Sequence, residues 1–241
     1  MSYMRNVIGN LLLSVLFLGA IAIFAEEKKE SFERQITVTV KANYLVILPE
    51  GYQADKKYPL MLFLHGAGER GNDLELVKKH GPFEKVKELK LPFIIVAPQC
   101  PENKYWDTDM LNYLLDELLV KYPVDPAQVY LTGLSMGGFG TWFWAMAHPE
   151  RFAAIVPICG GGEPGLVKDK MKDLPIWAFH GAKDKAVPLQ KSQEMVDAVN
   201  KIGGKVKFTV YPEAEHNSWT ETYNNPELYQ WMLSCKRQNT K

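Results

Sequence analysis

Three polar residue types that together support acyl transfer occur at well separated positions in the chain. Ser135 stands in the segment Gly133-Leu134-Ser135-Met136-Gly137, a G-x-S-x-G pattern. The flanking glycines suit a strained turn that presents a serine hydroxyl above the edge of a sheet. A serine hydroxyl is a weak nucleophile near neutral pH, so the chemistry also requires a base within hydrogen-bonding reach and an acid that orients the base.

His216 is the predicted base. It follows the last apolar run, 206–211, in a polar loop. Enzymes that use a serine elbow of this kind carry the serine, the acid and the histidine in that order, with the histidine after the last strand. The other four histidines stand at the ends of predicted strands or helices, and we interpret them as loop or packing residues: His65, His80, His148 and His180.

Asp184 is the predicted acid because it leaves the strand-like run 176–179, which precedes the run before His216. Its carboxylate would hold the imidazole tautomer and stabilise the imidazolium without itself becoming protonated. Three other acids remain alternatives. Asp173 comes before the same strand, and Glu213 and Glu215 crowd the histidine itself.

Acyl transfer also needs two hydrogen-bond donors for the tetrahedral oxyanion. The backbone N–H of Met136, directly after the serine, supplies one by the geometry of the elbow. We expect the second from the glycine-rich loop 65–71, and from Ala67 within it. An ordinary glycine turn is the alternative interpretation of this loop. Losing one such donor raises a transition-state barrier by about 3 kcal/mol.

The elements that position these residues follow an alternating pattern. Short apolar or alternating runs predict strands at 35–41, 44–48, 60–64, 93–97, 129–132, 154–158, 176–179 and 206–211. Apolar residues at helical spacing predict helices at 111–121, 136–147 and 192–202, with a final helix near Pro226. This alternation predicts an α/β domain with a mostly parallel central sheet and helices on both faces. Functional residues in such sheets collect on loops at the carboxyl ends of the strands.

Several segments together resemble the α/β-hydrolase superfamily. They are more similar to its small secreted esterases and predicted peptidases, which are related to feruloyl esterases and polyhydroxybutyrate depolymerases. The resembling segments are 64–71, 97–101, 133–142, 157–162 and 180–184. The resemblance implies an α/β-hydrolase fold and supports the triad of Ser135, Asp184 and His216. The segments between predicted strands are short, so we expect minimal or no lid and an open site.

Three residues are predicted to contact the substrate. Gln99 comes just after the predicted strand 93–97, and Trp106 lies in the loop after Gln99. Trp219 comes just past His216. Indole rings at these places suit stacking on a sugar or phenolic ring. Trp142 and Trp144, on the predicted helix after the serine, are interpreted as core residues.

Length and charge narrow the class of protein. The 241 residues suit one catalytic domain, predicted at 35–236, because a single core still grows at this size. The 28 basic and 28 acidic residues leave no excess positive charge for nucleic acid or an acidic membrane surface, so we expect neither partner. No cysteine has the paired spacing of a zinc site, and no cofactor or metal is expected.

The first residues differ from the rest. Arg5, the apolar run 7–24 and the charged run 26–30 predict a secretory signal peptide at 1–25 and a linker at 26–34. An uncleaved membrane anchor is the alternative, since the run nearly reaches the ~20 residues that span a bilayer. We therefore expect a secreted or periplasmic protein, without membrane contact in the mature form.

Export would permit disulfides among the three cysteines. A bridge between Cys100 and Cys159 is conceivable, but we interpret both as small buried thiols.

The leading hypothesis is hydrolysis of a carboxylic ester through an acyl-enzyme intermediate. The substrate would be a small molecule or an acyl or feruloyl ester on polysaccharide. A secreted serine peptidase of the prolyl-oligopeptidase-like type is one alternative, and a non-catalytic binding module of the same fold is another. The presence of all three triad residue types argues against the module.

Overall fold

The computed structural model describes residues 27–37 and 39–237. Residues 27–37 are exposed and contain no helix or strand. A separate compact unit begins at Val40. The predicted signal peptide at 1–25 lies outside the described residues. Within the described ranges, no helix has both the length and the apolar character needed to cross a bilayer.

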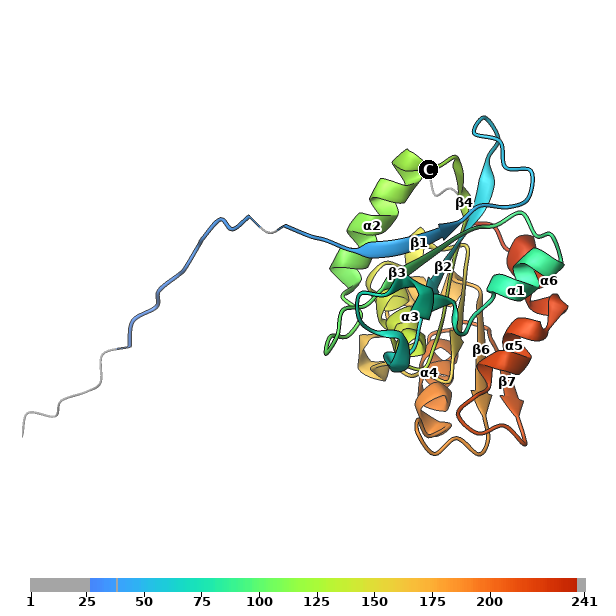
Figure 1. Cartoon of the computed structure of the whole chain (residues 1–241). Coiled ribbons are helices and arrows are strands. Elements are labelled where there is room, and N and C mark those ends of the chain that lie inside the picture. Colours follow the sequence, from blue (N-terminus) through green and yellow to red (C-terminus); the bar gives the residue numbers. More distant parts are fainter. Residues whose placement is uncertain (1–26, 38, 238–241) are drawn as a thin grey trace, which may run out of the picture. The chain divides into compact units, whose positions relative to one another are not determined.

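A seven-stranded sheet forms the centre of the compact unit (Figure 1). Its strands occur in the spatial order β1-β3-β2-β4-β5-β6-β7. Only β1 runs antiparallel to its neighbour, β3, and the other neighbouring pairs are parallel. The strands are β1 (Asn43–Ile47), β2 (Tyr58–Leu64), β3 (Ile94–Gln99), β4 (Val124–Leu134), β5 (Ala154–Ile158), β6 (Ile176–Gly181) and β7 (Val206–Tyr211).

Helices cover the sheet on both faces. For this reason β2, β3, β5 and β6 are buried along their whole length. Successive residues of β2 enter opposite cores: Leu62 packs in one and Phe63 in the other. The α-helices are α1 (Phe83–Glu88), α2 (Thr108–Lys121), α3 (Met136–Ala147), α4 (Gln190–Lys201), α5 (Trp219–Asn224) and α6 (Pro226–Ser234). Short 3₁₀ helices are η1 (Ala67–Glu69), η2 (Leu74–Lys78), η3 (Pro149–Arg151), η4 (Pro164–Leu166) and η5 (Asp169–Asp173).

The two cores assign the helices to layers. Side chains of α2, α3 and α4 pack in the core that contains Leu62, whereas side chains of α1, α5 and α6 pack in the core that contains Phe63. In Figure 1, α1, α5 and α6 accordingly lie on one side of the sheet. Trp142 and Trp144 are fully buried in the first core, as predicted. The predicted α/β architecture, with a mostly parallel sheet and helices on both faces, is confirmed.

One predicted strand is wrong. Residues 35–37 and 39–41 form no strand, and the sheet begins at β1. The run alternates polar and apolar residues, but it buries no apolar face, since Ile36 is 73% exposed and Val40 is 45% exposed. Alternation stabilises a strand only where a neighbouring strand and a core receive it. Two short helices, α1 and α5, were not predicted because six residues give too little periodicity to detect.

Candidate active site

Ser135 occupies a strained turn between β4 and α3. Its backbone dihedrals are φ 53° and ψ −117°, a conformation that non-glycine residues rarely adopt. Such a residue costs on the order of 1–3 kcal/mol and persists only where its surroundings hold it in place. The backbone N–H of Ser135 donates to Ile158 O at 3.0 Å, which ties the turn to the end of β5. The G-x-S-x-G segment therefore forms the elbow that its pattern predicts.

Gly133 and Gly137 must be glycines because neighbouring backbone atoms come too close to them to leave room for a side chain. A Cβ atom on Gly133 would overlap the carbonyl oxygen of Gly137, and one on Gly137 would overlap that of Leu64. Neither obstacle is a flexible side chain, so a methyl group would force β2, β4 and α3 apart. The absent side chains let the serine stand at the meeting point of these three elements.

We expect Gly137→Ala to lower the free energy of unfolding by about 4 kcal/mol or more, the size typical of severe backbone clashes. Urea unfolding followed by circular dichroism measures the loss. Gly68→Ala is the matched control, because nothing lies within 4 Å of a Cβ at Gly68 and its change should stay within about 0.5 kcal/mol. Equal stability of the two variants would contradict the close approach.

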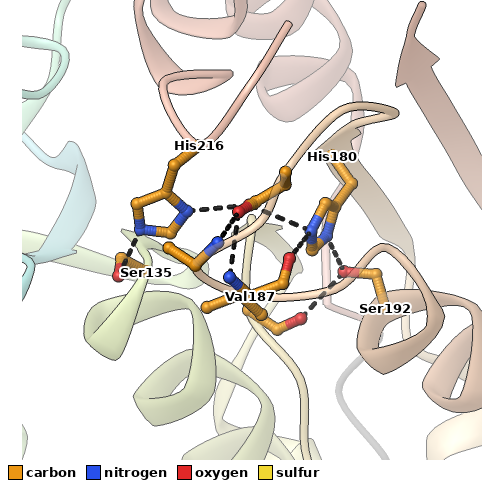
Figure 2. A network of polar contacts seen from close by, with 8 residues as sticks. Ser135, His180, Val187, Ser192 and His216 are labelled. Atoms are coloured by element: carbon orange, nitrogen blue, oxygen red, sulfur yellow. Dashed lines mark hydrogen bonds and ion pairs between the residues drawn. The ribbon is translucent and has the colours of Figure 1, made fainter.

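His216 lies between Ser135 and Asp184. Its Nε2 is 2.9 Å from Ser135 Oγ, and its Nδ1 is 2.7 Å from Asp184 Oδ2. Figure 2 shows the His216 ring directed at Ser135. An ionised carboxylate can only accept hydrogen bonds, so Nδ1 carries the imidazole proton and Nε2 is left to accept the proton of the hydroxyl. The structure thus brings together the three residues that the sequence predicted, in the orientation that proton transfer needs.

Backbone contacts hold the acid loop against the histidine loop. Ala182 N–H donates to Tyr211 O at 2.9 Å, and Lys183 N–H donates to Ala214 O at 3.0 Å. A Cβ on Gly181 would overlap the carbonyl oxygens of Glu215 and Ala214. The loops after β6 and β7 are therefore in direct contact at the carboxyl edge of the sheet.

The Asp184 side chain is fully buried, and donors surround its carboxylate. Oδ1 accepts backbone hydrogen bonds from Ala186 and Val187, both at 2.9 Å, while Oδ2 faces His216. The alternative acids lie elsewhere: Asp173 is exposed in η5, Glu213 pairs with Lys183, and Glu215 is exposed. Among the acidic residues that the structure describes, Asp184 is the one hydrogen-bonded to His216.

The loop predicted to supply an oxyanion donor lies against the elbow. A Cβ on Gly66 would come within 2.9 Å of Leu134 Cδ1, and a Cβ on Gly137 would come within 2.8 Å of His65 O. Ala67 is the first residue of η1 and Met136 is the first residue of α3, positions whose N–H groups have no partner within their own helix. The two predicted donors, the N–H groups of Ala67 and Met136, therefore belong to elements that meet at Ser135. Their role in binding an oxyanion stays a prediction.

His65 stabilises this loop from inside. Its Nε2 accepts from Cys100 N–H at 3.0 Å, so Nδ1 carries the proton and donates to Gly66 O at 2.6 Å. Burial is the main cause that lowers the pKa of His65, which favours this neutral form. His65 is therefore a packing histidine, as the sequence suggested.

The structure places Gln99, a predicted substrate contact, inside the protein, and its contact with a substrate stays a prediction. Its side chain is 3% exposed, and its amide nitrogen donates to Glu69 O at 2.9 Å and Asp73 O at 2.8 Å. Glu69 belongs to the loop 65–71, and Asp73 lies just after it. Gln99, the last residue of β3, thus helps to hold this loop in place.

Trp106 and Trp219 lie at two sides of the candidate site. Trp106 donates from Nε1 to His65 O at 3.3 Å and packs on Gly140 of α3. The Trp219 ring lies 5.4 Å from the His216 ring, edge to face. A cavity of about 180 Å³ has Trp219, Phe83 and Tyr223 in its wall, and neither Ser135 nor His216 lines it. Substrate contact by either tryptophan stays a prediction.

Cys100 and Cys159 are unbonded and buried, which confirms their interpretation as small buried thiols. Cys159 Sγ also lies near Asp184 and His216, and ligand atoms of the three residues fall within 4.8 Å of one another. In the described part of the chain this is the one cluster with the spacing of a metal site. Two of its members already bond each other, and burial raises the pKa of Cys159 to about 12, which keeps the thiol protonated. We assign no metal to it.

Comparison with known proteins places the chain in a family. The model of the "Dienelactone hydrolase family" matches residues 29–230. A probable feruloyl esterase C of Aspergillus terreus is 26% identical over 199 residues, which cover 77% of this chain and 73% of that protein. A dipeptidyl-peptidase 5 of Porphyromonas gingivalis is 23% identical and is covered over 34% of its length.

A solved structure titled as that of a thermostable esterase is 37% identical, with a TM-score of 0.73. The match covers 80% of this chain and 59% of that one, so the chain spans less than two thirds of this structural relative. The shared architecture is the α/β-hydrolase fold. With a family model matched along most of its length and esterases among its relatives, this chain is a hydrolase that belongs to the dienelactone hydrolase family.

Proposed function

We propose that this hydrolase is a serine esterase that cleaves carboxylic esters through an acyl-enzyme intermediate. The observation that carries the proposal is the unbroken chain of hydrogen bonds from Ser135 through His216 to Asp184. His216 takes the proton of Ser135 as its oxygen attacks the ester carbonyl, and then delivers that proton to the departing alkoxide. A water molecule activated by the same imidazole hydrolyses the acyl-enzyme in the second half of the reaction.

The tetrahedral oxyanion is proposed to bind at the N–H groups of Met136 and Ala67. The amino end of α3 points its dipole at the same place, which favours the developing negative charge. Rigid backbone donors cost no reorganisation during the reaction. The His65 and Gln99 contacts described above support this function because they fix the loop that carries Ala67.

The proposed substrate is an ester of a phenolic acid or other acyl group, carried on a small molecule or on polysaccharide. The position of Trp219 supports this choice, because its indole lies against the ring of the base and aromatic side chains favour flat rings as partners. The similarity to a feruloyl esterase points in the same direction. A polysaccharide substrate also fits the predicted export of the chain by a signal peptide at residues 1–25.

A panel of substrates tests the proposal. Purified protein is assayed with nitrophenyl esters of increasing acyl length, a feruloylated sugar and a peptide nitroanilide. We expect turnover of esters at least about a hundredfold above turnover of the amide, because the amine that leaves an amide is a poorer leaving group than the alkoxide or phenoxide that leaves an ester. Turnover of the amide alone would replace the esterase with a serine peptidase. If the protein turns over none of these substrates and Ser135 does not react with a fluorophosphonate, the esterase proposal fails. The alternative of a non-catalytic binding module would then replace it.

Replacement of Trp219 tests the ring-binding wall. We expect Trp219→Ala to lower kcat/KM about tenfold for a feruloyl ester, since an aromatic contact is worth about 1–1.5 kcal/mol, mainly through a higher KM. Trp219→Phe keeps a ring and should lose about twofold or less. Ethyl acetate, an ester that carries no ring, serves as the control substrate. Equal losses with both substrates would instead assign Trp219 to the support of His216.

A further inference from the structure

A second histidine lies beside the buried acid. His180 is the penultimate residue of β6, and its side chain has no exposed surface. Its Nε2 is 2.8 Å from Val187 O and 3.2 Å from Asp184 Oδ2, the oxygen that also binds His216. Figure 2 shows His180 on the opposite side of this network from Ser135, with Ser192 next to its ring. The mechanism proposed above makes no use of His180.

The neighbours of His180 determine where its proton lies. A carbonyl oxygen and a carboxylate oxygen face Nε2, and both can only accept, so Nε2 carries a proton in either charge state of the ring. Nδ1 faces Ser192 Oγ at 2.7 Å, and that hydroxyl also lies 2.9 Å from Gly160 O. The single hydroxyl proton of Ser192 goes to Nδ1 when the ring is neutral and to Gly160 O when it is charged. Burial is the main cause that lowers the pKa of His180, which favours the neutral ring.

We propose that His180 is a positioning residue that shares its Nε2–H between Val187 O and Asp184 Oδ2, and so controls how strongly Asp184 acts on His216. The inference rests on the proposed function, which makes His216 the base. With this donor, every oxygen of Asp184 has two partners: Ala186 and Val187 at Oδ1, and His216 and His180 at Oδ2.

Two effects follow. A second donor on Oδ2 disperses the negative charge of Asp184, which weakens its attraction for the His216 imidazolium. The same donor holds Oδ2 on the line toward His216 Nδ1. Among the described residues, Cys159, just after β5, is a further titratable group close to Asp184 and His216, and its raised pKa of about 12 keeps it neutral. Its thiol therefore adds no charge to the balance between the two imidazoles.

The test compares His180→Phe, which keeps a ring but removes the donor, with His180→Gln, whose amide can donate from the same place. We expect His180→Phe to move the acid limb of kcat/KM to higher pH by about half a unit, the effect of one modest hydrogen bond. Above that limb kcat should fall about tenfold with KM unchanged within twofold, and His180→Gln should restore both values to within about threefold and 0.2 unit of wild type.

Proton NMR gives a reading that needs no substrate. The pKa of His216 is followed through its ring C–H signals, and its bond to Asp184 through the low-field Nδ1–H resonance. Absence of esterase activity in the wild type would overturn the proposed function, while the NMR titration still decides the role of His180. If His180→Phe does not fold, Ser192→Ala frees Nδ1 and should shift the pKa of His216 in the same direction by a smaller amount. An unchanged His216 pKa in the folded variants, or a shift that His180→Gln fails to reverse, overturns the inference.

Discussion

Replacing Ser135 by alanine is expected to lower kcat for ester hydrolysis by about 10⁴- to 10⁶-fold, the range found when a serine nucleophile is removed from a working triad. The variant cannot form the acyl-enzyme, because His216 then faces a methyl group in place of the hydroxyl 2.9 Å away. Stopped-flow or continuous assay with a nitrophenyl ester measures the loss. Mass spectrometry after treatment with a fluorophosphonate should find the adduct on Ser135 in the wild type and none in the variant.

Ser234→Ala is the matched control for this experiment. Ser234 lies at the end of α6, where its hydroxyl donates to Trp231 O at 2.7 Å, outside the candidate site. It should keep wild-type kcat and KM. If Ser135→Ala retained more than about one part in a hundred of the wild-type kcat, the acyl-enzyme mechanism would be wrong.

Replacing Asp184 by asparagine is expected to lower kcat by about 10⁴-fold with little change in fold. The backbone N–H groups of Ala186 and Val187 both point at Oδ1, so they will select the carbonyl oxygen of the asparagine. Its NH₂ group then faces Nδ1 of His216 and donates to it. That contact forces the imidazole proton onto Nε2, the nitrogen that must accept a proton from Ser135.

The pH dependence distinguishes this explanation from simple damage. Hydroxide can replace the misdirected base, so the residual activity of Asp184→Asn should rise with pH beyond the range in which the wild type has levelled off. Asp173→Asn, in exposed η5, should leave both rate and pH profile unchanged. A large loss in Asp173→Asn, with Asp184→Asn near wild type, would exchange the roles of the two acids.

Much of the site could be predicted from the sequence because its residues follow strands that are easy to recognise in the sequence. Ser135, Asp184 and His216 follow β4, β6 and β7, which are apolar runs bounded by glycine, proline or charge. In a parallel sheet the carboxyl ends of strands share one edge, so order along the chain was enough to bring the three together. The first and last residues of α3, β5 and β7 were predicted correctly, because clear boundaries in the sequence mark these segments.

Where the structure adds to what the sequence indicates, contacts between residues distant in the chain are the reason. Gln99 is polar and follows a strand, the usual mark of a ligand contact, but carbonyl groups some 30 residues earlier occupy its amide. His180 was interpreted as a packing histidine, and its contact with Asp184 depends on how the loop after β6 folds back. The spacing of four residues between His180 and Asp184 was a signal that could have been used. The periodicity of apolar residues carries no information on how a loop folds back onto distant residues.

The backbone at Ser135 has a consequence for the durability of the molecule. A serine held at positive φ keeps its hydroxyl aimed at His216, and the packing of β2, β4 and α3 around it offsets the cost in strain. Cys159, at the end of the neighbouring strand, also has a positive φ, as do Lys90 and Asn103. The candidate site thus holds two of the four non-glycine residues with positive φ in the described part of the chain. Efforts to make the protein more heat-resistant should leave the candidate site untouched and strengthen the opposite end of the sheet.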